Sequence, residues 1–436
     1  MRQLVVIAGG LGSRLSNSGV RCPKILLEVS GVTLLERYVR LAEENSYGQL
    51  LLILGHQSDE VRNFLLTKDF PIEIVVTVEN QRLGTAGALI QSRKFLHNEF
   101  TLILGDLLIE NCNLEGSFKF FQHSISDVLC FVKYTDHPED SDLVDVGLDG
   151  RLINLHKYPH KEIPQVATSL AGVAHIRKEV IPIDIPTTKI DFFKETLWEL
   201  VRNNSRVFCI YHQGLVRDIG TPSRLSDSES YLNDVTSYKK SNSGLLLDRD
   251  GTLIQDIPYN IDAQKVQLLS HSKNLIKKSV KFFDYVAVIT NQPLVARGDG
   301  EISDVIKINS RMNELLGDER LIQDFLVCPH HPDSGFQGEL VEFKVKCNCR
   351  KPEVNLLLQA GIKGKFFLTN SLYIGDSDID VYAALRVGAS WIHLHIDSAQ
   401  SLKLCPLNKL HNGECVSSME VIARMEDWND YFEDTP

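Results

Sequence analysis

Short apolar runs alternate with longer amphipathic stretches along the first part of the chain. The apolar runs have the length of buried strands, and the stretches between them have the pattern of surface helices. The expected strands are 4–8, 50–54, 72–78, 100–104, 128–134 and 171–176, and the expected helices are 33–45 and 58–66. Alternation of this kind is typical of a largely parallel sheet that carries helices on both faces.

The alternation breaks once and then starts again. Residues 232–243 are polar and rich in turn formers, and buried-strand patterns resume at 244–247, 286–289 and 371–374. The length of 436 residues also exceeds what a single core usually organises. We therefore expect two doubly wound, mostly parallel α/β domains. Their expected bounds are 1–232 and 244–425, with a linker at 233–243 and a partly disordered acidic tail at 426–436.

Composition and charge narrow the classes of partner. The chain carries 46 Lys and Arg against 57 Asp and Glu, a formal net charge of -11, which argues against nucleic acid. No apolar run approaches the roughly 18 residues that a membrane helix needs. Nine cysteines argue against a disulfide framework and favour a reducing, cytoplasmic location. An anionic substrate must then be bound by local cations, backbone amides or metal ions.

A glycine-rich loop follows the first expected strand. Gly9, Gly10 and Gly12 allow backbone amides to approach phosphate oxygens closely, although such a loop also occurs as a simple tight turn. Arg14 and Lys24 favour the phosphate site, because two nearby cations could neutralise a triphosphate. Otherwise these two residues would be solvated surface cations.

Two aspartates follow later apolar runs. Asp106 comes directly after the strand expected at 100–104, and Asp218 stands in the run Val-Arg-Asp-Ile-Gly-Thr-Pro at 216–222. Mg²⁺ prefers one or two carboxylates together with phosphate oxygens, so both aspartates are candidates to hold it. Each could instead cap a helix.

The motifs of the first half occur in a fixed order. They are Gly-Gly-x-Gly-x-Arg at 9–14, Pro-Lys at 23–24, Leu-Gly-Thr-Ala-Gly-Ala at 83–88, Gly-Asp at 105–106 and Asp-Ile-Gly-Thr-Pro at 218–222. In this order they resemble the sugar-nucleotide pyrophosphorylase family, nucleotidyltransferases that join a sugar 1-phosphate to a nucleoside triphosphate and release pyrophosphate. The resemblance covers the expected first domain and implies a Rossmann-like fold.

The resemblance also implies roles for individual residues. The sugar phosphate would attack the α-phosphorus in line, with Lys24 and Arg14 stabilising charge and Asp106 and Asp218 holding Mg²⁺. The other implied contacts are Gly9, Gly10, Gly12 and Ser13 to the phosphates, Leu83, Gly84 and Thr85 near the base, and Lys157 to the sugar phosphate.

The second half contains Asp248-Arg-Asp250-Gly-Thr directly after a buried apolar run. Asp248 can attack phosphorus, and Asp250 can protonate the leaving oxygen and then activate water. An acid that works at neutral pH needs a raised pKa, which neighbouring negative charge can provide. A chance Asp-Gly turn would be the simpler explanation in isolation. The other pieces of a phosphate site are Thr290, Asn291 and Gln292 as hydrogen-bond donors, Lys351 as a cation and Asp376 as an Mg²⁺ carboxylate.

Two close pairs of metal-binding side chains lie downstream. Cys328-x-His330 and Cys347-x-Cys349 offer three thiols and an imidazole, a set suited to structural Zn²⁺ with no open position. His331 is a competing imidazole that the spacing does not exclude. Paired cysteines could otherwise form a disulfide or be buried as small apolar groups.

The strand-end motifs of the second half resemble the haloacid dehalogenase superfamily of phosphatases, over about residues 244–395. The Cys-Pro-His and Cys-x-Cys-Arg-Lys motifs, with the long loop between them, are similar to those of the D-glycero-D-manno-heptose 1,7-bisphosphate phosphatases. The resemblance implies a Rossmannoid fold. It also implies Zn²⁺ on Cys328, His330, Cys347 and Cys349, Mg²⁺ on Asp248, Asp250 and Asp376, and substrate contacts from Thr290, Asn291, Gln292, Arg297, Arg350 and Lys351.

The two implied activities fit together as consecutive steps. Removal of the 7-phosphate from a heptose 1,7-bisphosphate gives a heptose 1-phosphate, which is the substrate class of the first half. A resemblance of the first half to heptose 1-phosphate guanylyltransferases implies GTP as donor and GDP-heptose as product. Three alternatives stay open: another sugar or base, a histidinol-phosphate-type phosphatase, and a catalytically silent sugar-nucleotide sensor. The sequence also leaves open the base, the anomer, channelling and whether the chain forms a homo-oligomer.

Overall fold

A computed structural model describes most of the chain. The described residues are 1–9, 22–55, 57–135, 137–233, 235–317, 321–395 and 413–417. Gly10, Gly12, Ser13 and Arg14 of the predicted glycine loop lie outside these ranges, as does the predicted tail 426–436. Within the described ranges, no helix combines the length and apolar composition needed to cross a membrane.

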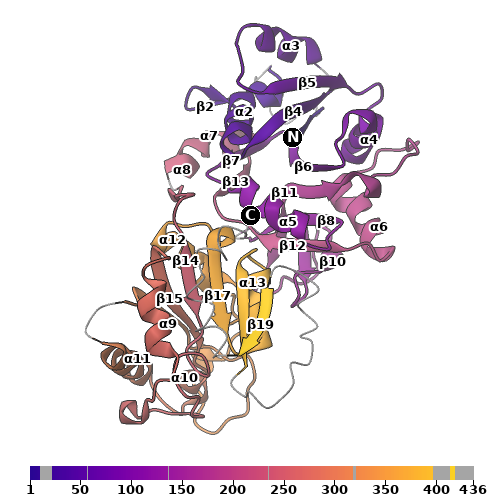
Figure 1. Cartoon of the computed structure of the whole chain (residues 1–436). Helices are drawn as coiled ribbons and strands as arrows, with labels where there is room; N and C mark the ends of the chain where they lie inside the picture. The colour runs from indigo at the N-terminus through magenta and orange to yellow at the C-terminus, as the bar shows by residue number, and fades with distance from the viewer. Residues whose placement is uncertain are drawn as a thin grey trace.

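Two main sheets organise the chain, one in each half, and Figure 1 shows them one above the other. The strands of the first are β1 (Arg2–Ala8), β4 (Tyr47–Leu54), β5 (Glu73–Val78), β6 (Glu99–Leu104), β8 (Val128–Tyr134), β9 (Leu143–Val146), β10 (Leu152–His156), β11 (Thr168–Arg177) and β12 (Val207–Tyr211). Strands β6, β1, β4 and β5 are parallel neighbours in that order. Strand β11 runs antiparallel to β6, β8 and β9, a reversal that the strand pattern did not predict.

The remaining elements of the first half cover this sheet and connect its strands. The helices are α2 (Leu34–Glu44), α3 (Ser58–Leu66), α4 (Gly84–Gln91), α5 (Leu114–His123), α6 (Leu197–Arg202), α7 (Pro222–Ser226) and α8 (Ser228–Asn233). The short elements are η1 (Lys24–Leu26), β2 (Glu28–Val29), β3 (Val32–Thr33), η2 (Arg93–Phe95), η3 (Lys178–Val180) and the π-helix η4 (Phe192–Thr196). Helix α2 starts with a capping box, in which Thr33 and Glu36 each accept a hydrogen bond from the other's backbone amide.

A separate two-stranded ribbon brings distant residues of the first half together. Strand β7 (Leu107–Glu110) pairs antiparallel with β13 (Leu215–Asp218), and Asp218 stands opposite Leu107. The amide of Ile219 donates to the carbonyl of Asp106 at 3.0 Å. Asp106 and Asp218 therefore lie next to each other, although 111 residues separate them in the sequence.

The second sheet is parallel throughout, in the order β16-β15-β14-β17-β18-β19. Its strands are β14 (Gly244–Leu247), β15 (Tyr285–Asn291), β16 (Asp324–Cys328), β17 (Ser371–Gly375), β18 (Ser390–His395) and β19 (Gly413–Ser417). Its helices are α9 (Ser272–Ser279), α10 (Leu294–Arg297), α11 (Ile302–Leu316), α12 (Asn355–Gly364) and α13 (Asp378–Leu385), with short η5 (Ala263–Lys265), η6 (Val341–Phe343) and η7 (Leu368–Asn370). The predicted α/β class is thus confirmed.

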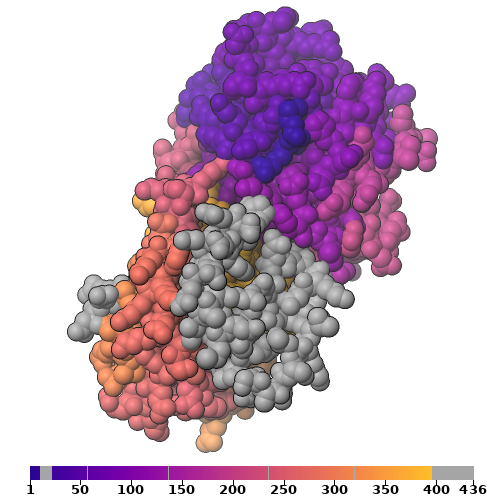
Figure 2. Space-filling view, viewed as in Figure 1, coloured from indigo at the N-terminus to yellow at the C-terminus, as the bar shows by residue number. Residues whose placement is uncertain are grey.

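The two halves pack directly against each other. One hydrophobic cluster contains Cys209 and Tyr211 of β12 together with Leu385 and Val387 of the second half. Polar contacts accompany it, since the side chain of Gln213 donates to the carbonyl of Phe366 at 3.2 Å. In the space-filling view of Figure 2, the indigo and purple residues of the first half gather above the pink and orange residues of the second. Apolar contact across the boundary makes the two sheets parts of one packed body.

Candidate functional site

A cavity of about 540 Å³ lies in the first half, and both Asp106 and Asp218 line it. Nζ of Lys24, at the start of η1, lies 2.8 Å from Oδ2 of Asp106. Gly220 shows how closely the three groups are packed: a Cβ atom there would lie 2.8 Å from Lys24 Nζ, 2.9 Å from Asp218 Oδ1 and 3.3 Å from Asp106 Oδ2. Two carboxylates around one backbone turn, with a cation beside them, suit Mg²⁺ and phosphate oxygens.

The predicted nucleotide loop lies beside this cavity. Gly84 has a φ of 77°, and a Cβ atom there would collide with the backbone of Ile190, so the position requires glycine. The hydroxyl of Thr85 donates to Asp191, which lines the cavity, at 3.0 Å and accepts from the amide of Phe192 at 2.7 Å. These contacts fix the loop, while the predicted base contacts of Leu83, Gly84 and Thr85 stay predictions.

Gly9 is the part of the predicted glycine loop that the structure describes. The carboxylate of Glu79 occupies the space that a Cβ atom at Gly9 would need, and burial raises the pKa of Glu79. The first strand therefore ends in close contact with the residue that follows β5. The phosphate contact predicted for Gly9 stays a prediction.

Besides Arg217 of the 216–222 run, three cations outside the predicted motifs line the cavity: Lys133, Lys194 and Arg224. Arg224 bridges two carboxylates, donating to Asp218 at 2.6 Å and to Asp140 at 3.2 Å. The cavity therefore presents both positive charge and hydrogen-bond acceptors.

Lys194 and Lys157 differ in position. Lys194 Nζ lies 2.7 Å from Asp142 Oδ2 at the cavity wall. Although burial opposes it, this contact lowers the pKa of Asp142. Lys157, for which a sugar-phosphate contact was predicted, is exposed just after β10 and is not among the residues that line the cavity. The structure thus brings Lys194, rather than Lys157, to the cavity.

The second sheet gathers an ion cluster at its carboxyl edge. Asp248 follows β14, Asp376 follows β17, and with Asp380 of α13 their carboxylate oxygens lie within 4.8 Å of one another. Lys351 Nζ donates to Asp248 at 2.5 Å and to Asp380 at 2.6 Å. Such a set fits a divalent cation, because oxygen ligands of this kind are those Mg²⁺ prefers.

Burial sets the protonation of this cluster. Burial raises the pKa of Asp248, and burial together with the Asp380 carboxylate raises the pKa of Asp376 to about 6. Although burial opposes it, the negative charges of Asp248 and Asp380 hold the pKa of Lys351 above its ordinary value. Lys351 is therefore a permanent cation beside the nucleophile candidate.

Asp250 departs from its predicted role as an Mg²⁺ ligand. Its carboxylate accepts from Arg249 at 2.9 Å and from the amide of Gln292 at 2.7 Å, so it lies outside the carboxylate cluster. Asp380, which was not predicted, takes that place. Asp250 lines a cavity of about 330 Å³. Its part in proton transfer stays a prediction.

The other predicted substrate contacts divide between cavity and scaffold. Asn291, Gln292 and Arg297 line the same 330 Å³ cavity as Asp250. Thr290 is buried and accepts from Gln292 at 2.7 Å. Asn291 also exchanges hydrogen bonds with the backbone of Lys351, at 3.0 and 3.1 Å, and so holds the segment that carries this lysine.

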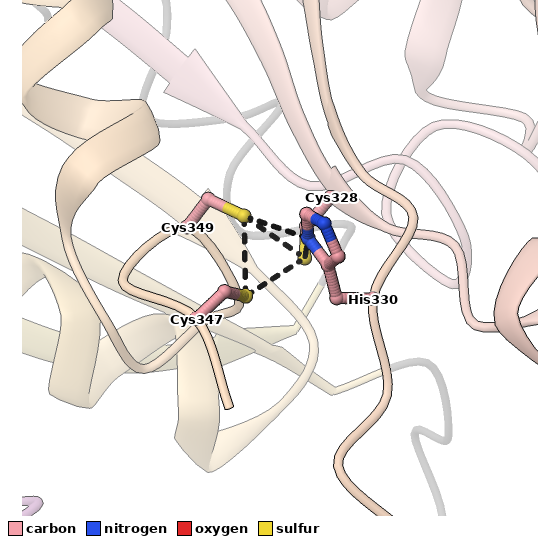
Figure 3. Close-up of side chains that lie close together, drawn as sticks. All are labelled: Cys328, His330, Cys347 and Cys349. Carbon is pink, nitrogen blue, oxygen red and sulfur yellow. Dashed lines mark hydrogen bonds between the residues drawn. The ribbon is translucent and has the colours of Figure 1, made fainter. Parts of the chain in front are cut away.

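The four predicted zinc ligands converge on one point (Figure 3). Cys328 ends β16, and Cys347 and Cys349 come from a loop that folds back over it. The sulfur atom of Cys349 lies 3.3 Å from that of Cys328 and 3.2 Å from both Cys347 Sγ and His330 Nδ1. Four thiol and imidazole ligands at these separations fit a single tetrahedral metal ion.

His330, and not His331, lies in this cluster. Nδ1 of His331 accepts from the amide of Asp333 at 3.2 Å, and its ring packs against Phe336, so it lies outside the cluster. Arg350 donates to the carbonyl of His330 at 3.1 Å and thus braces the cluster. Its predicted contact with substrate stays a prediction.

Comparison with known proteins gives a separate account of each half. A family model described as nucleotidyl transferase matches residues 3–234. The bifunctional protein GlmU of Methanococcus maripaludis is 24% identical over 244 residues, covering 53% of this chain. The chain spans 55% of that relative's length.

Other relatives match a shorter part of the chain. The D-glycero-beta-D-manno-heptose-1,7-bisphosphate 7-phosphatase of Yersinia pestis is 31% identical over 142 residues, covering 32% of this chain and 73% of the relative. The protein of the same name from Escherichia coli K12 is 31% identical over 147 residues and is covered to 75%. Among solved structures, HddC from Yersinia pseudotuberculosis has 23% identity and a TM-score of 0.45, with 53% of this chain and all of that chain covered.

Proposed function

Because the chain belongs to the nucleotidyl transferase family and also to the family of the D-glycero-beta-D-manno-heptose-1,7-bisphosphate 7-phosphatases, we propose that it is a bifunctional enzyme. One activity transfers a nucleotidyl group to a sugar 1-phosphate and releases pyrophosphate. The other hydrolyses a phosphate ester of a sugar bisphosphate. We assign the first to residues 1–232 and the second to residues 244–425, with 233–243 as the linker.

The transferase reaction uses the cavity beside Asp106. A phosphate oxygen of the sugar 1-phosphate attacks the α-phosphorus, the bond to the β-phosphate breaks, and pyrophosphate leaves. Lys24 supplies positive charge at the reacting phosphates. Arg224 and Lys194 neutralise the negative charge of the sugar phosphate. Mg²⁺, held by Asp106 and Asp218, would supply further neutralisation of phosphate charge.

The phosphatase reaction uses the cluster around Asp248. Its carboxylate attacks phosphorus and forms an aspartyl-phosphate, while Asp250 protonates the leaving oxygen and then removes a proton from the attacking water. Gln292 and Arg249 hold the Asp250 carboxylate at the 330 Å³ cavity. Lys351 offsets the negative charge of the attacking carboxylate as it approaches the anionic phosphate. Asp248 and Asp376 would hold Mg²⁺, which would supply further positive charge.

We propose that the two reactions are consecutive. Removing the 7-phosphate from D-glycero-D-manno-heptose 1,7-bisphosphate yields a heptose 1-phosphate, and the transferase then forms a nucleotide-activated heptose. The observation that carries this proposal is the presence in one chain of the Asp248–Lys351 cluster and the Asp106–Lys24 cluster. As the base we propose guanine, with GTP as donor and GDP-heptose as product.

The test supplies heptose 1,7-bisphosphate and GTP to the purified full-length protein. Release of phosphate followed by pyrophosphate, together with a GDP-sugar detected by mass spectrometry, is the expected result. A panel of ATP, CTP, UTP and dTTP, and of both anomers, measures the preference for base and anomer. Release of phosphate from histidinol phosphate but not from the heptose substrate would contradict the assignment of the second half.

Two further assignments accompany this function. We propose that Cys328, His330, Cys347 and Cys349 hold a structural Zn²⁺, because four close thiol and imidazole ligands leave no position open for substrate. We also propose a cytoplasmic location, where nucleoside triphosphates are made and thiols stay reduced. Metal analysis and fractionation of cells that produce the protein test the two assignments separately.

A further inference from the structure

Tyr134, the last residue of β8, reaches from the first half into the second. Its hydroxyl donates to Oε2 of Glu353 at 2.7 Å and accepts from the amide of Val354 at 3.0 Å. The Tyr134 ring packs against that of Tyr211 at the end of β12, with 4.6 Å between ring centroids. Two neighbouring strands of the first sheet thus present a pair of tyrosines to residues 353–354.

Arg386 completes this contact from the second half. It caps the carboxyl end of α13 and is 2% exposed. Its guanidinium donates to the hydroxyl of Tyr211 at 3.2 Å, to the carbonyl of Pro352 at 2.8 Å and to Glu353 at 3.3 Å. In return, the amide of Tyr211 donates to the carbonyl of Arg386 at 2.8 Å. Tyr134, Tyr211, Glu353 and Arg386 form one network, which we term the tyrosine–arginine network.

The tyrosine–arginine network pairs opposite charges, although the buried Nε of Arg386 has no hydrogen-bond partner. The Glu353 carboxylate offsets the buried guanidinium of Arg386, with 3.3 Å between the charged groups. Burial raises the pKa of Tyr134, so its hydroxyl stays protonated and donates to Glu353. Buried polar groups are costly when unpaired, so loss of one member leaves its partners without their hydrogen bonds.

This network lies directly behind the phosphatase site. Pro352 and Glu353 follow Lys351 in the chain, and the amide of Glu353 donates to the carbonyl of Arg350 at 2.8 Å to close a turn. Arg386 is the residue after α13, the helix whose Asp380 accepts from Lys351. Tyr134 of the first half binds Glu353, two residues after Lys351, and Tyr211 binds Arg386, which follows the helix that carries Asp380. The first half therefore contacts the segments that carry both partners of the Lys351–Asp380 ion pair.

We propose that Tyr134 and Tyr211 are positioning residues of the phosphatase reaction, and that they act through Glu353 and Arg386 on Lys351. The first half of the chain then carries the transferase site and also helps to position Lys351 in the phosphatase site. This inference rests on the proposed phosphatase activity. A shift of about 1 Å in a positioning group can cost about a hundredfold in rate, so the contact between the halves has a direct catalytic consequence.

The test compares Tyr134→Phe with wild type in the full-length protein. We expect kcat for phosphate release to fall about tenfold, as for loss of a hydrogen bond that orients a catalytic group. The KM should change less than twofold, because the cavity-lining residues Asn291 and Arg297 are untouched. Pyrophosphate release from GTP and directly supplied heptose 1-phosphate should also change less than twofold. A phosphatase kcat within twofold of wild type would overturn the inference.

Tyr47→Phe is the matched control. Tyr47 lies in the same sheet as Tyr134 and is 2% exposed. Its hydroxyl lies 2.5 Å from that of Thr101, and Tyr47 is not a member of the tyrosine–arginine network. It should lower the melting temperature while leaving the phosphatase kcat unchanged. If Tyr47→Phe reduced kcat as much as Tyr134→Phe does, the effect would be one of general stability and the inference would fail.

A double-mutant cycle with Glu353→Ala tests the route. If Tyr134 acts through Glu353, the double variant loses no more activity than the more damaging single variant. Losses that multiply would overturn this route. Running p-nitrophenyl phosphate beside heptose bisphosphate separates the inference from the substrate assignment. Wild type that cleaves only p-nitrophenyl phosphate would contradict the heptose substrate but still allow the variants to be compared, and wild type that cleaves neither would overturn both proposals.

Discussion

The ammonium nitrogen of Lys351 lies 2.5 Å from Oδ1 of Asp248, so the carboxylate proposed as nucleophile is held by a buried cation. The same nitrogen donates to Asp380 at 2.6 Å, and Asp376 belongs to the same group of carboxylates. Two acidic side chains thus share one lysine, whose own side chain is only 4% exposed, and a third carboxylate lies beside them.

Replacing this lysine by methionine should affect both activity and stability. Breaking a buried ion pair from one side typically costs about 3–5 kcal/mol, because the remaining charge stays buried and unpaired. We expect Lys351→Met to lower the free energy of unfolding by about that amount in the presence of chelator, measured by urea denaturation, and to abolish phosphate release. Added Mg²⁺ should restore part of the stability but not the activity. Unchanged stability in chelator would contradict the buried-pair geometry.

Asp248→Asn should separate the two activities. The amide keeps the size of the side chain but cannot act as nucleophile, so phosphate release should fall by at least about a thousandfold. Pyrophosphate release from GTP and directly supplied heptose 1-phosphate should persist, because the cavity at Asp106 is lined by other residues. Both products are measured on the same preparation. Loss of both activities would show that the sites are not chemically independent.

Asp106→Ala should give the reverse result. Removing this carboxylate leaves Lys24 without its partner at 2.8 Å and removes an expected Mg²⁺ ligand, so pyrophosphate release should fall by about a hundredfold or more. Phosphate release should be unchanged. Asp184→Ala, at an exposed position outside the cavity, is the control. Wild-type pyrophosphate release by Asp106→Ala would rule out the proposed site.

Cys347→Ser should remove the bound metal. The serine is a poor ligand for a soft site, so we expect less than one tenth of the wild-type zinc content by elemental analysis and a lower melting temperature. His331→Ala, which alters the imidazole outside the cluster, should retain its metal. Wild type purified without chelator and found free of zinc would refute the assignment of Zn²⁺.

His175 should make the chain sensitive to acid. The ring is fully buried and hydrogen-bonded to Thr101 and Ser117, and burial lowers its pKa to about 3. The unfolded chain, where a histidine titrates near 6.5, therefore binds more protons than the folded chain between these two values, and stability falls as the pH falls. The expected slope from this group is roughly 1.4 kcal/mol per pH unit below about pH 6.5.

Urea denaturation at pH 7 and pH 5 measures this effect. His175→Asn should lower stability at pH 7 but show a weaker loss on going to pH 5 than wild type, because the variant has no imidazole to protonate. Equal losses in the two proteins would exclude His175 as the source.

Strand-end chemistry was readable from the sequence because it depends on local order. Asp248, Asn291 and Asp376 each end or follow a buried apolar run, and parallel strands deliver such residues to one edge. Asp380 was missed, although Ser377 and Asp380 form a capping box whose spacing the sequence shows. Its second role, accepting from Lys351, has no local signal.

Other features depend on contacts between distant segments. Lys133, Lys194 and Arg224 come from β8, η4 and α7, and only the folded chain brings them to one cavity. The antiparallel direction of β11 also has no sequence mark, because a strand with buried residues on both faces reads alike in either direction. The contacts that hold the Asp250 side chain apart from the carboxylate cluster, from Arg249 and from the side chain of Gln292, also have no local sequence signal.

The packing of β12 and β8 against the segment around Glu353 has a consequence for how the molecule melts. Hydrogen bonds and apolar contacts that cross the boundary make the unfolding of one sheet expose surface of the other. Calorimetry should therefore record a single cooperative endotherm in place of two. If the chain were divided at the linker, each fragment would expose the apolar surface that the other half now covers. The separate fragments would for that reason aggregate.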